Sequence, residues 1–145
     1  MCLNDFRNVL QVLAKIEPDE VYNLAGQTSV GLSFKQPVKT LESIATGTLN
    51  LLEAIQFTGG KIKLYNASSS ECFGETGGKA AEENTPFHPR SPYAVAKATA
   101  FWEVTNYREA YNFFPCYWGN QRFTRISCPR VGHLRIRLGG TYSYR

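Results

Sequence analysis

The chain has 145 residues, of which 43% are hydrophobic, and this content is sufficient for the core of one domain or of a piece of a larger one. A largely disordered chain is therefore not expected. No apolar stretch approaches about 18 residues, and the N-terminus lacks a basic-then-apolar signal pattern, so we expect a cytoplasmic protein with no membrane partner.

The net charge of +4 is unevenly distributed along the chain. Residues 110–145 contain six arginines and no lysine, aspartate or glutamate, whereas residues 1–109 carry a small acidic excess. The basic character therefore belongs to the tail alone. The four cysteines show neither C-x-x-C spacing nor a shared histidine pattern, so we expect reduced thiols and no metal site. They are Cys2, Cys72, Cys116 and Cys128.

The first elements are a helix and a short strand. "NDFRNVLQVLAKI" begins with the capping residues Asn4 and Asp5 and carries apolar residues at helical spacing, which predicts a surface helix with one buried stripe. Pro18 and Asp19 end it. "EVYNLAG" then predicts a strand that closes at Gly26.

The rest of the chain continues the alternation. The spacing predicts a long helix over 36–57, stopped by Gly59 and Gly60, then a strand at "KIKLYNAS", a loop over 72–90 and a helix over 91–111. Alternating helices and strands are typical of an α/β fold with a parallel sheet. Ligands of such folds lie beyond the carboxyl ends of the strands.

Polar groups that could carry out chemistry follow the second predicted strand and begin the last predicted helix. "SSSE" places Ser69 and Glu71 directly after the strand. Tyr93 and Lys97 are four residues apart and share one helical face. A nearby ammonium favours phenolate and lowers the pKa of a tyrosine, and a hydroxyl can hold the substrate oxygen that exchanges the proton. Y-x-x-x-K alone also occurs as an exposed amphipathic pair.

The sequence from about Leu3 to Tyr111 resembles the middle of the GDP-mannose 4,6-dehydratase family, extended short-chain dehydrogenases/reductases that use NADP. The resemblance rests on "YNLAGQTSV", "ATGTLNLLEAI", "KLYNASSSECFG" and "TPFHPRSPYAVAKATAFWEVTNYREAY". It implies a partial Rossmann-type, doubly wound parallel sheet over residues 1–115. Residues 116–145 would form a divergent basic tail, disordered or non-native.

The resemblance also implies a reaction, in which GDP-mannose becomes GDP-4-keto-6-deoxymannose and water. Tyr93 would take the C4 hydroxyl proton while hydride passes to NADP, with Lys97 supporting the phenolate and binding the nicotinamide ribose. Ser69 would be the hydroxyl of the catalytic triad. Glu71 would take the C5 proton and help water to leave C6.

The strand end after "VYN" matches the part of the family that contacts the cofactor, although a plain strand-to-loop turn explains it equally well. The residues concerned are Leu24, Ala25, Gly26, Gln27 and Thr28. We interpret His88 as a loop contact and Glu82 and Glu83 as a solvated acidic edge. Phe101 and Trp102 are interpreted as core or subunit contacts, because the family assembles as dimers or tetramers through the helices matching 36–57 and 91–111.

Two features depart from the family pattern. The chain has no G-x-x-G-x-x-G segment, the motif that receives the cofactor pyrophosphate, so we expect weak NADP binding. The tail replaces a family segment like "NHESPARG". One codon choice for residues 124–130, shifted by one base, reads H-E-S-P-A-R-G, which suggests a frameshift near residues 112–116.

Three alternatives to an active dehydratase remain open at this point. The chain could be an inactive fragment of such a gene, with exposed apolar surfaces, or it could serve another nucleotide-sugar epimerase or dehydratase reaction. The third alternative is nucleic-acid binding through the tail, whose aromatic residues could stack on bases. These are Trp118, Phe123, Tyr142 and Tyr144. No known nucleic-acid-binding module frames them, so we expect no nucleic-acid partner.

Overall fold

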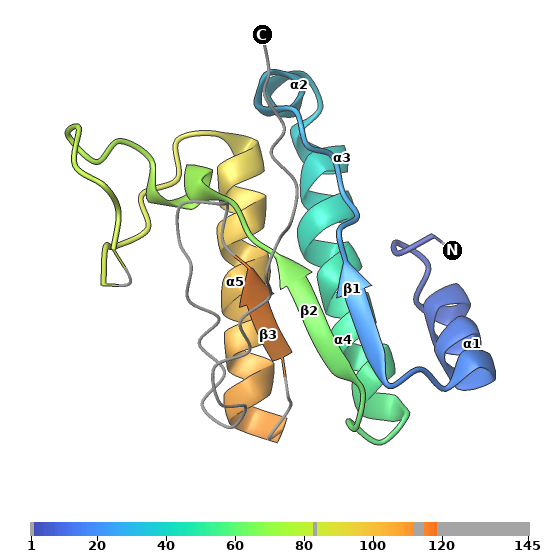
Figure 1. The fold of residues 1–145 in the computed structure, drawn as a ribbon. Coiled ribbons are helices and arrows are strands. Elements are labelled where there is room, and N and C mark those ends of the chain that lie inside the picture. Colours follow the sequence, from blue (N-terminus) through green and yellow to red (C-terminus); the bar gives the residue numbers. More distant parts are fainter. Residues whose placement is uncertain (1, 83, 112–114, 119–145) are drawn as a thin grey trace, which may run out of the picture.

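The computed structural model describes residues 2–82, 84–111 and 115–118 (Figure 1). Three parallel strands form its sheet in the order β1 (Glu20–Asn23), β2 (Lys63–Ala67) and β3 (Pro115–Trp118). Asn23 pairs with Asn66 across β1 and β2, and Asn66 pairs with Tyr117 across β2 and β3. The predicted α/β fold with a parallel sheet is confirmed. Both predicted strands are present and shorter than their sequence patterns.

Helix α1 (Phe6–Ile16) begins and ends as the sequence predicts. The Asp5 carboxylate accepts a hydrogen bond of 3.2 Å from the Asn8 backbone N–H, which satisfies one of the free donors of the first turn. Glu17 then adopts a left-handed conformation with φ of 48° and ends the helix one residue before Pro18. Val9 and Leu13 are the buried stripe.

The region between β1 and β2 is more divided than the single helix predicted over 36–57. A short helix α2 (Val30–Lys35), which the sequence analysis did not predict, precedes α3 (Pro37–Leu41). A π-helical turn η1 (Glu42–Thr46) then leads without a break into α4 (Gly47–Phe57). The glycines end α4 as predicted, since the Gly60 backbone N–H donates to Ile55 O at 2.9 Å.

The last described helix, α5 (Pro92–Tyr111), matches the predicted boundary almost to the residue. Ser91 caps it, because its hydroxyl accepts from the Ala94 N–H at 3.1 Å and its carbonyl from the Val95 N–H at 2.9 Å. Pro92 fits the first helical position, where no N–H is needed. A 3-10 turn, η2 (Ser70–Phe73), interrupts the start of the predicted loop.

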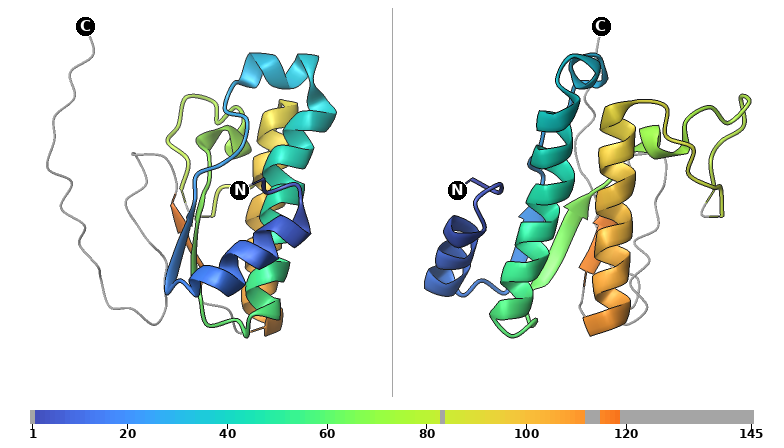
Figure 2. Two further views of the ribbon diagram at one scale, coloured as in Figure 1. Left: turned by 90° about the vertical axis from the view of Figure 1, so that its right-hand side faces the viewer. Right: turned by 180° about the vertical axis from the view of Figure 1, so that it is seen from behind.

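Helices α4 and α5 lie side by side over one face of the sheet, and α1 packs against α4 at the edge next to β1 (Figure 2). The main core forms between these layers from apolar residues of α1, α4, β2 and α5. Its largest fully buried members include Val9, Leu51, Leu52, Ile55, Leu64 and Val104. A second, smaller cluster lies toward the carboxyl ends of the strands and contains Ile44, Tyr93, Ala96 and Ala100.

The described residues include no helix that is both long and apolar enough to cross a bilayer. The boundary that we place at residue 115 falls within β3, so residues 116–118 of the predicted tail form part of a strand. Residues 119–145 lie outside the described residues. They include the segment from which the frameshift hypothesis is drawn and three of the four tail aromatics.

Candidate functional site

The site begins where two strands end. Asn23 and Asn66 are partners in the parallel register, so the segments that follow them leave the sheet at the same edge. After β1 comes the loop Leu24–Thr28, and after β2 come Ser69 and η2. Both segments therefore follow the carboxyl ends of neighbouring parallel strands.

Helix α5 presents Tyr93 and Lys97 at that edge. Tyr93 is buried in the second helical position of α5, where the positive end of the helix dipole favours a negative charge. Lys97, one turn later, is only 9% exposed and donates from Nζ to Ala67 O at 2.9 Å. This bond ties α5 to the end of β2, two residues before Ser69. Burial lowers the pKa of Lys97, and the nearby Cys72 thiol opposes this lowering.

Ser69 precedes η2 as its cap, and Glu71 lies within this turn. The Ser69 hydroxyl caps this turn by accepting from the Glu71 N–H at 3.3 Å, and the Glu71 carboxylate is exposed. Cys72, fully buried beneath the turn, places Sγ 3.9 Å from Ala94 O and so holds η2 against the first turn of α5. Burial raises the pKa of this thiol, which keeps it protonated.

The four predicted catalytic residues are thus brought to one region by backbone contacts. Lys97 binds the β2 end, and the residue after Glu71 contacts the residue after Tyr93. No hydrogen bond joins the four side chains to one another within the described part of the chain. Their hydroxyl, phenol, ammonium and carboxylate groups therefore remain available to a ligand at this edge.

The loop Leu24–Thr28 is held against the same region from the other side. Gly26 has φ of 118°, and a Cβ there would lie 2.8 Å from Ile44 Cγ1. Ile44, on η1, belongs to the small apolar cluster that contains Tyr93. The Gln27 N–H donates to Ser43 Oγ at 3.4 Å, while Gln27 Oε1 is buried without a hydrogen-bond partner among the described residues.

Sequence reasoning missed three buried polar residues directly behind this site. Asn23, Asn66 and Thr48 form a hydrogen-bonded group between β1, β2 and α4. An asparagine after a tyrosine near the end of each strand was the available signal. It was not informative alone, because the pairing depends on the register between two distant strands.

The residues interpreted as structural differ in their surroundings. The His88 backbone N–H donates to Cys72 O at 2.9 Å, so His88 makes a loop contact. Phe101 and Trp102 form T-shaped contacts with Phe87 of the loop. Trp102 is 59% exposed and so is not a core residue, and the subunit contact stays a prediction. Glu82 is exposed, and Glu83 lies outside the described residues.

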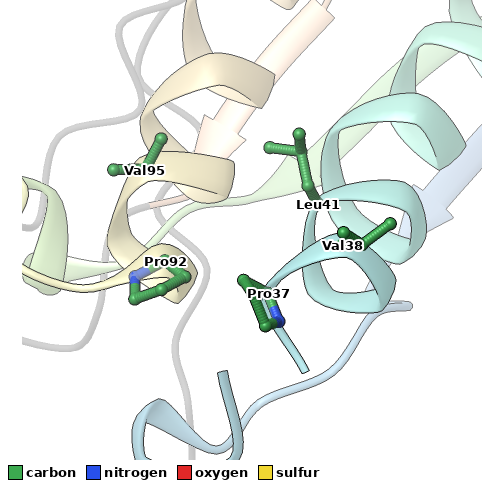
Figure 3. Close-up of a pocket in the computed structure, with 5 residues that line it drawn as sticks. All are labelled: Pro37, Val38, Leu41, Pro92 and Val95. Atoms are coloured by element: carbon green, nitrogen blue, oxygen red, sulfur yellow. The ribbon is translucent and has the colours of Figure 1, made fainter. Parts of the chain in front are cut away.

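The described residues contain no group of three or more histidine, cysteine or acidic side chains that could hold a metal ion. A groove of about 320 Å³ lies between the first turns of α3 and α5 (Figure 3). None of the predicted site residues lines this groove. Its lining is apolar and consists of Pro37, Val38, Leu41, Pro92 and Val95.

Comparison with protein families identifies this arrangement. The family described as GDP-mannose 4,6 dehydratase matches residues 2–129. The chain belongs to the GDP-mannose 4,6-dehydratase family. Within it, the Vibrio cholerae GDP-mannose 4,6-dehydratase is 50% identical over 116 residues, and the Arabidopsis thaliana GDP-mannose 4,6 dehydratase 1 is 49% identical over 118 residues. Each alignment covers 79% of this chain, and the chain spans only 31% and 32% of those two relatives.

Solved structures place this dehydratase-family chain in the same fold as nucleotide-sugar epimerases. The Thermus thermophilus UDP-glucose 4-epimerase, in complex with NAD, superposes with a TM-score of 0.75 at 34% identity and covers 82% of this chain and 38% of its own. RMD from Pseudomonas aeruginosa, complexed with NADPH, superposes with a TM-score of 0.74 at 29% identity. The match covers 81% of this chain and 40% of the RMD chain. The partial Rossmann-type fold is therefore confirmed.

Proposed function

We propose that this chain carries the catalytic part of a GDP-mannose 4,6-dehydratase that converts GDP-mannose to GDP-4-keto-6-deoxymannose and water with NADP as cofactor. The proposal rests on one observation above all: a chain of this family brings Ser69, Glu71, Tyr93 and Lys97 to the edge where β1 and β2 end. A reductase needs groups like Ser69, Tyr93 and Lys97. Elimination of water also needs an acid, which is Glu71 here.

In this proposal Tyr93 takes the proton of the C4 hydroxyl. When Tyr93 takes this proton in the proposed reaction, the N-terminus of α5 and the Lys97 ammonium on the same helical face supply positive charge near the reacting groups. Ser69 holds the C4 oxygen from the β2 side. Glu71 takes the C5 proton and then assists the loss of the C6 hydroxyl, and its exposed carboxylate can reach a ligand without first breaking an ion pair in the described part of the chain.

The residues at this edge fit a nicotinamide cofactor by their donors and acceptors. Lys97 has three ammonium hydrogens and uses one for Ala67 O, which leaves donors for ribose hydroxyls. The buried Gln27 Oε1 lacks a partner among the described residues, and Gly26 leaves the loop without a side chain at its closest approach to the small core. NADP supplies a hydride acceptor when bound. We propose that Leu24, Ala25, Gly26, Gln27 and Thr28 line its site together with Tyr93 and Lys97.

The test is a reaction of the purified chain with saturating NADP and GDP-mannose that carries deuterium at C4. We expect a product that has lost one water molecule and carries the deuterium at C6, detected by mass spectrometry. Tyr93→Phe and Glu71→Gln should each lower product formation by about a hundredfold or more. Tyr111→Phe on the same helix and Glu82→Gln on the loop are the matched controls and should keep activity.

The second reading is an inactive fragment, and it is favoured by the share of the relatives that the chain spans, 31% for the Vibrio cholerae enzyme. A chain that gives the circular dichroism of a folded α/β protein but forms no product under these conditions would support that reading. Product with deuterium retained at C4 would instead indicate another nucleotide-sugar reaction.

We further propose that the protein works in the cytoplasm and associates with a second copy. The cytoplasm is a reducing compartment, and Cys2 and Cys72 are free thiols. Association is supported by apolar side chains of α3 and α5 that line the groove of Figure 3 and are exposed, namely Val38, Leu41 and Val95.

A further inference from the structure

We infer that Asn23 is a positioning residue, which with Asn66 and Thr48 fixes the loop Leu24–Thr28 relative to the strand end that binds Lys97 and carries Ser69. The inference deepens the proposed function and rests on it for the identity of the site. It concerns the geometry behind the site, because the three side chains are buried and lie beneath the reacting groups.

Asn23 makes three hydrogen bonds through its side-chain amide. Its Nδ2 donates to Asn66 Oδ1 at 2.7 Å and to Thr48 Oγ1 at 3.3 Å, and its Oδ1 accepts from the Ala25 N–H at 3.2 Å. Asn23, Asn66 and Thr48 are 7%, 4% and 2% exposed. Both Nδ2 hydrogens are therefore used, toward β2 and α4, and Oδ1 binds the loop.

The orientation of the Asn23 amide follows from its partners. Thr48 has one hydroxyl hydrogen, and it donates this to Ile44 O at 2.6 Å, so toward Asn23 it can only accept. The Nδ2 group of Asn23 must then face Thr48, which leaves Oδ1 for the Ala25 N–H. A single side chain therefore sets the direction in which the loop leaves β1.

The same group connects to the other half of the site. Asn66 is followed directly by Ala67, whose carbonyl accepts from Lys97 Nζ at 2.9 Å. Thr48 bonds to the carbonyl of Ile44, and Ile44 packs in the cluster that contains Tyr93. Asn23 is therefore one bonded step from the loop, one from the strand end that binds Lys97, and two from the cluster around Tyr93.

A purely stabilising role would not need these residue types. Asparagine is depleted in strands, and an apolar pair of the same shape can replace a buried hydrogen-bonded pair at little cost. A buried amide pair instead specifies the register of the two strands. If one strand slipped by one residue, its asparagine would move to the opposite face of the sheet and the pair would be lost. The pair is suited to holding two segments in one relative position.

The experiment compares Asn23→Leu, Asn66→Leu and the double variant in the full 145-residue chain. Asn50→Leu is the matched control, because Asn50 Nδ2 also makes one long-range bond, 2.8 Å to Leu3 O, away from the strand ends. Two quantities are measured: the urea midpoint of unfolding, and the pH at which the Lys97 side chain titrates in an NMR experiment. Lys97→Arg assigns the Lys97 signal.

We expect each single variant to lower the urea midpoint and the double variant to regain most of the loss. If the pair positions the strand end, the double variant should differ from the wild-type chain at Lys97 even though its stability is regained. Lys97 should then titrate at a pH higher than in the wild type by about half a unit or more, a threefold change in its dissociation constant, because Lys97 is less buried. Asn50→Leu should lower stability and leave this titration unchanged. Regained stability with unchanged titration of Lys97 would overturn the inference.

A milder variant covers the case in which the leucine variants do not fold. Thr48→Val conserves volume and removes the acceptor that orients the Asn23 amide. We expect faster hydrogen exchange at the Ala25 amide, and an unchanged exchange rate there would also overturn the inference. No readout uses substrate or cofactor, so an inactive chain would contradict the proposed function and leave this inference standing.

Discussion

At the scale of single residues, the backbone conformation at Gly26 and its contact with Ile44 leave no room for a side chain. Its φ of 118° is disfavoured for any other residue, and a Cβ would lie 2.8 Å from Ile44 Cγ1. We therefore predict that Gly26→Ala lowers the free energy of unfolding by about 1–3 kcal/mol, measured by urea denaturation. The variant should also displace the loop from Tyr93, since Ile44 packs beside both.

Gly31 provides the matched control for this prediction. It lies inside α2, and a Cβ there meets nothing within 4 Å. Gly31→Ala should raise the free energy of unfolding by about 0.5–1 kcal/mol, because alanine favours the helix and restricts the unfolded chain. If the two variants have the same effect, the conformation at Gly26 is not what limits substitution.

The sequence reveals some site residues and conceals others for a physical reason. Tyr93 and Lys97 are visible because the helical repeat alone places residues four apart on one face. Asn23 and Asn66 are concealed because their bond depends on the alignment of two strands that are separated by the helical segments α2 to α4. Which side chains become buried partners is decided by tertiary packing and cannot be obtained from local spacing.

At the scale of secondary structure elements, α5 carries an acid whose ionisation depends on folding. Glu103 Oε2 is buried without a hydrogen-bond partner in the described part of the chain, and burial raises the pKa of this carboxyl to about 7. Tyr107 is a titratable group near it, and the Tyr107 hydroxyl donates to Glu53. The folded chain thus binds a proton that the unfolded chain releases between about pH 4.5 and pH 7.

The sign of the pH dependence follows from this difference. Because the folded pKa lies above the unfolded value, the free energy of unfolding should fall as pH rises through 4.5 to 7 and stay low at pH 8. Glu103→Gln should raise the free energy of unfolding, measured by urea denaturation at pH 8, by on the order of 1 kcal/mol after allowance for solvent around the half-buried carboxyl, and change it little at pH 5. Glu109→Gln, exposed on α5, is the control, and an equal gain at pH 5 would contradict the prediction.

The elements themselves were largely predictable. Apolar periodicity predicts α1 and α5. Their N-terminal ends are fixed by the capping residues Asp5 and Ser91, whose side chains accept hydrogen bonds from the first turn. Helix α2 and the turn η1 were not predicted. Six residues are too few for a clear periodicity, and the change to π-helical bonding within 36–57 leaves no local signal in the sequence.

At the scale of the whole molecule, the helices divide the surface into covered and open parts. The described helices α4 and α5 cover one face of the sheet (Figure 2), and an apolar groove lies between the first turns of α3 and α5 (Figure 3). Three apolar side chains that line it lie at the surface: Val38, Leu41 and Val95. Exposed apolar surface of this kind marks contact sites, which is the basis for the proposed association.

Association through this face predicts a specific response to one added charge. Val38→Glu, at a side chain 67% exposed on α3, should lower the mass measured by light scattering from that of a dimer or larger assembly toward one chain, because the carboxylate would lose its water on contact. Ile16→Glu, at a side chain 64% exposed at the end of α1, adds the same charge away from the groove and should leave the mass unchanged. A wild-type chain that stays monomeric at every concentration would refute association. A loss of mass in both variants would place the contact elsewhere.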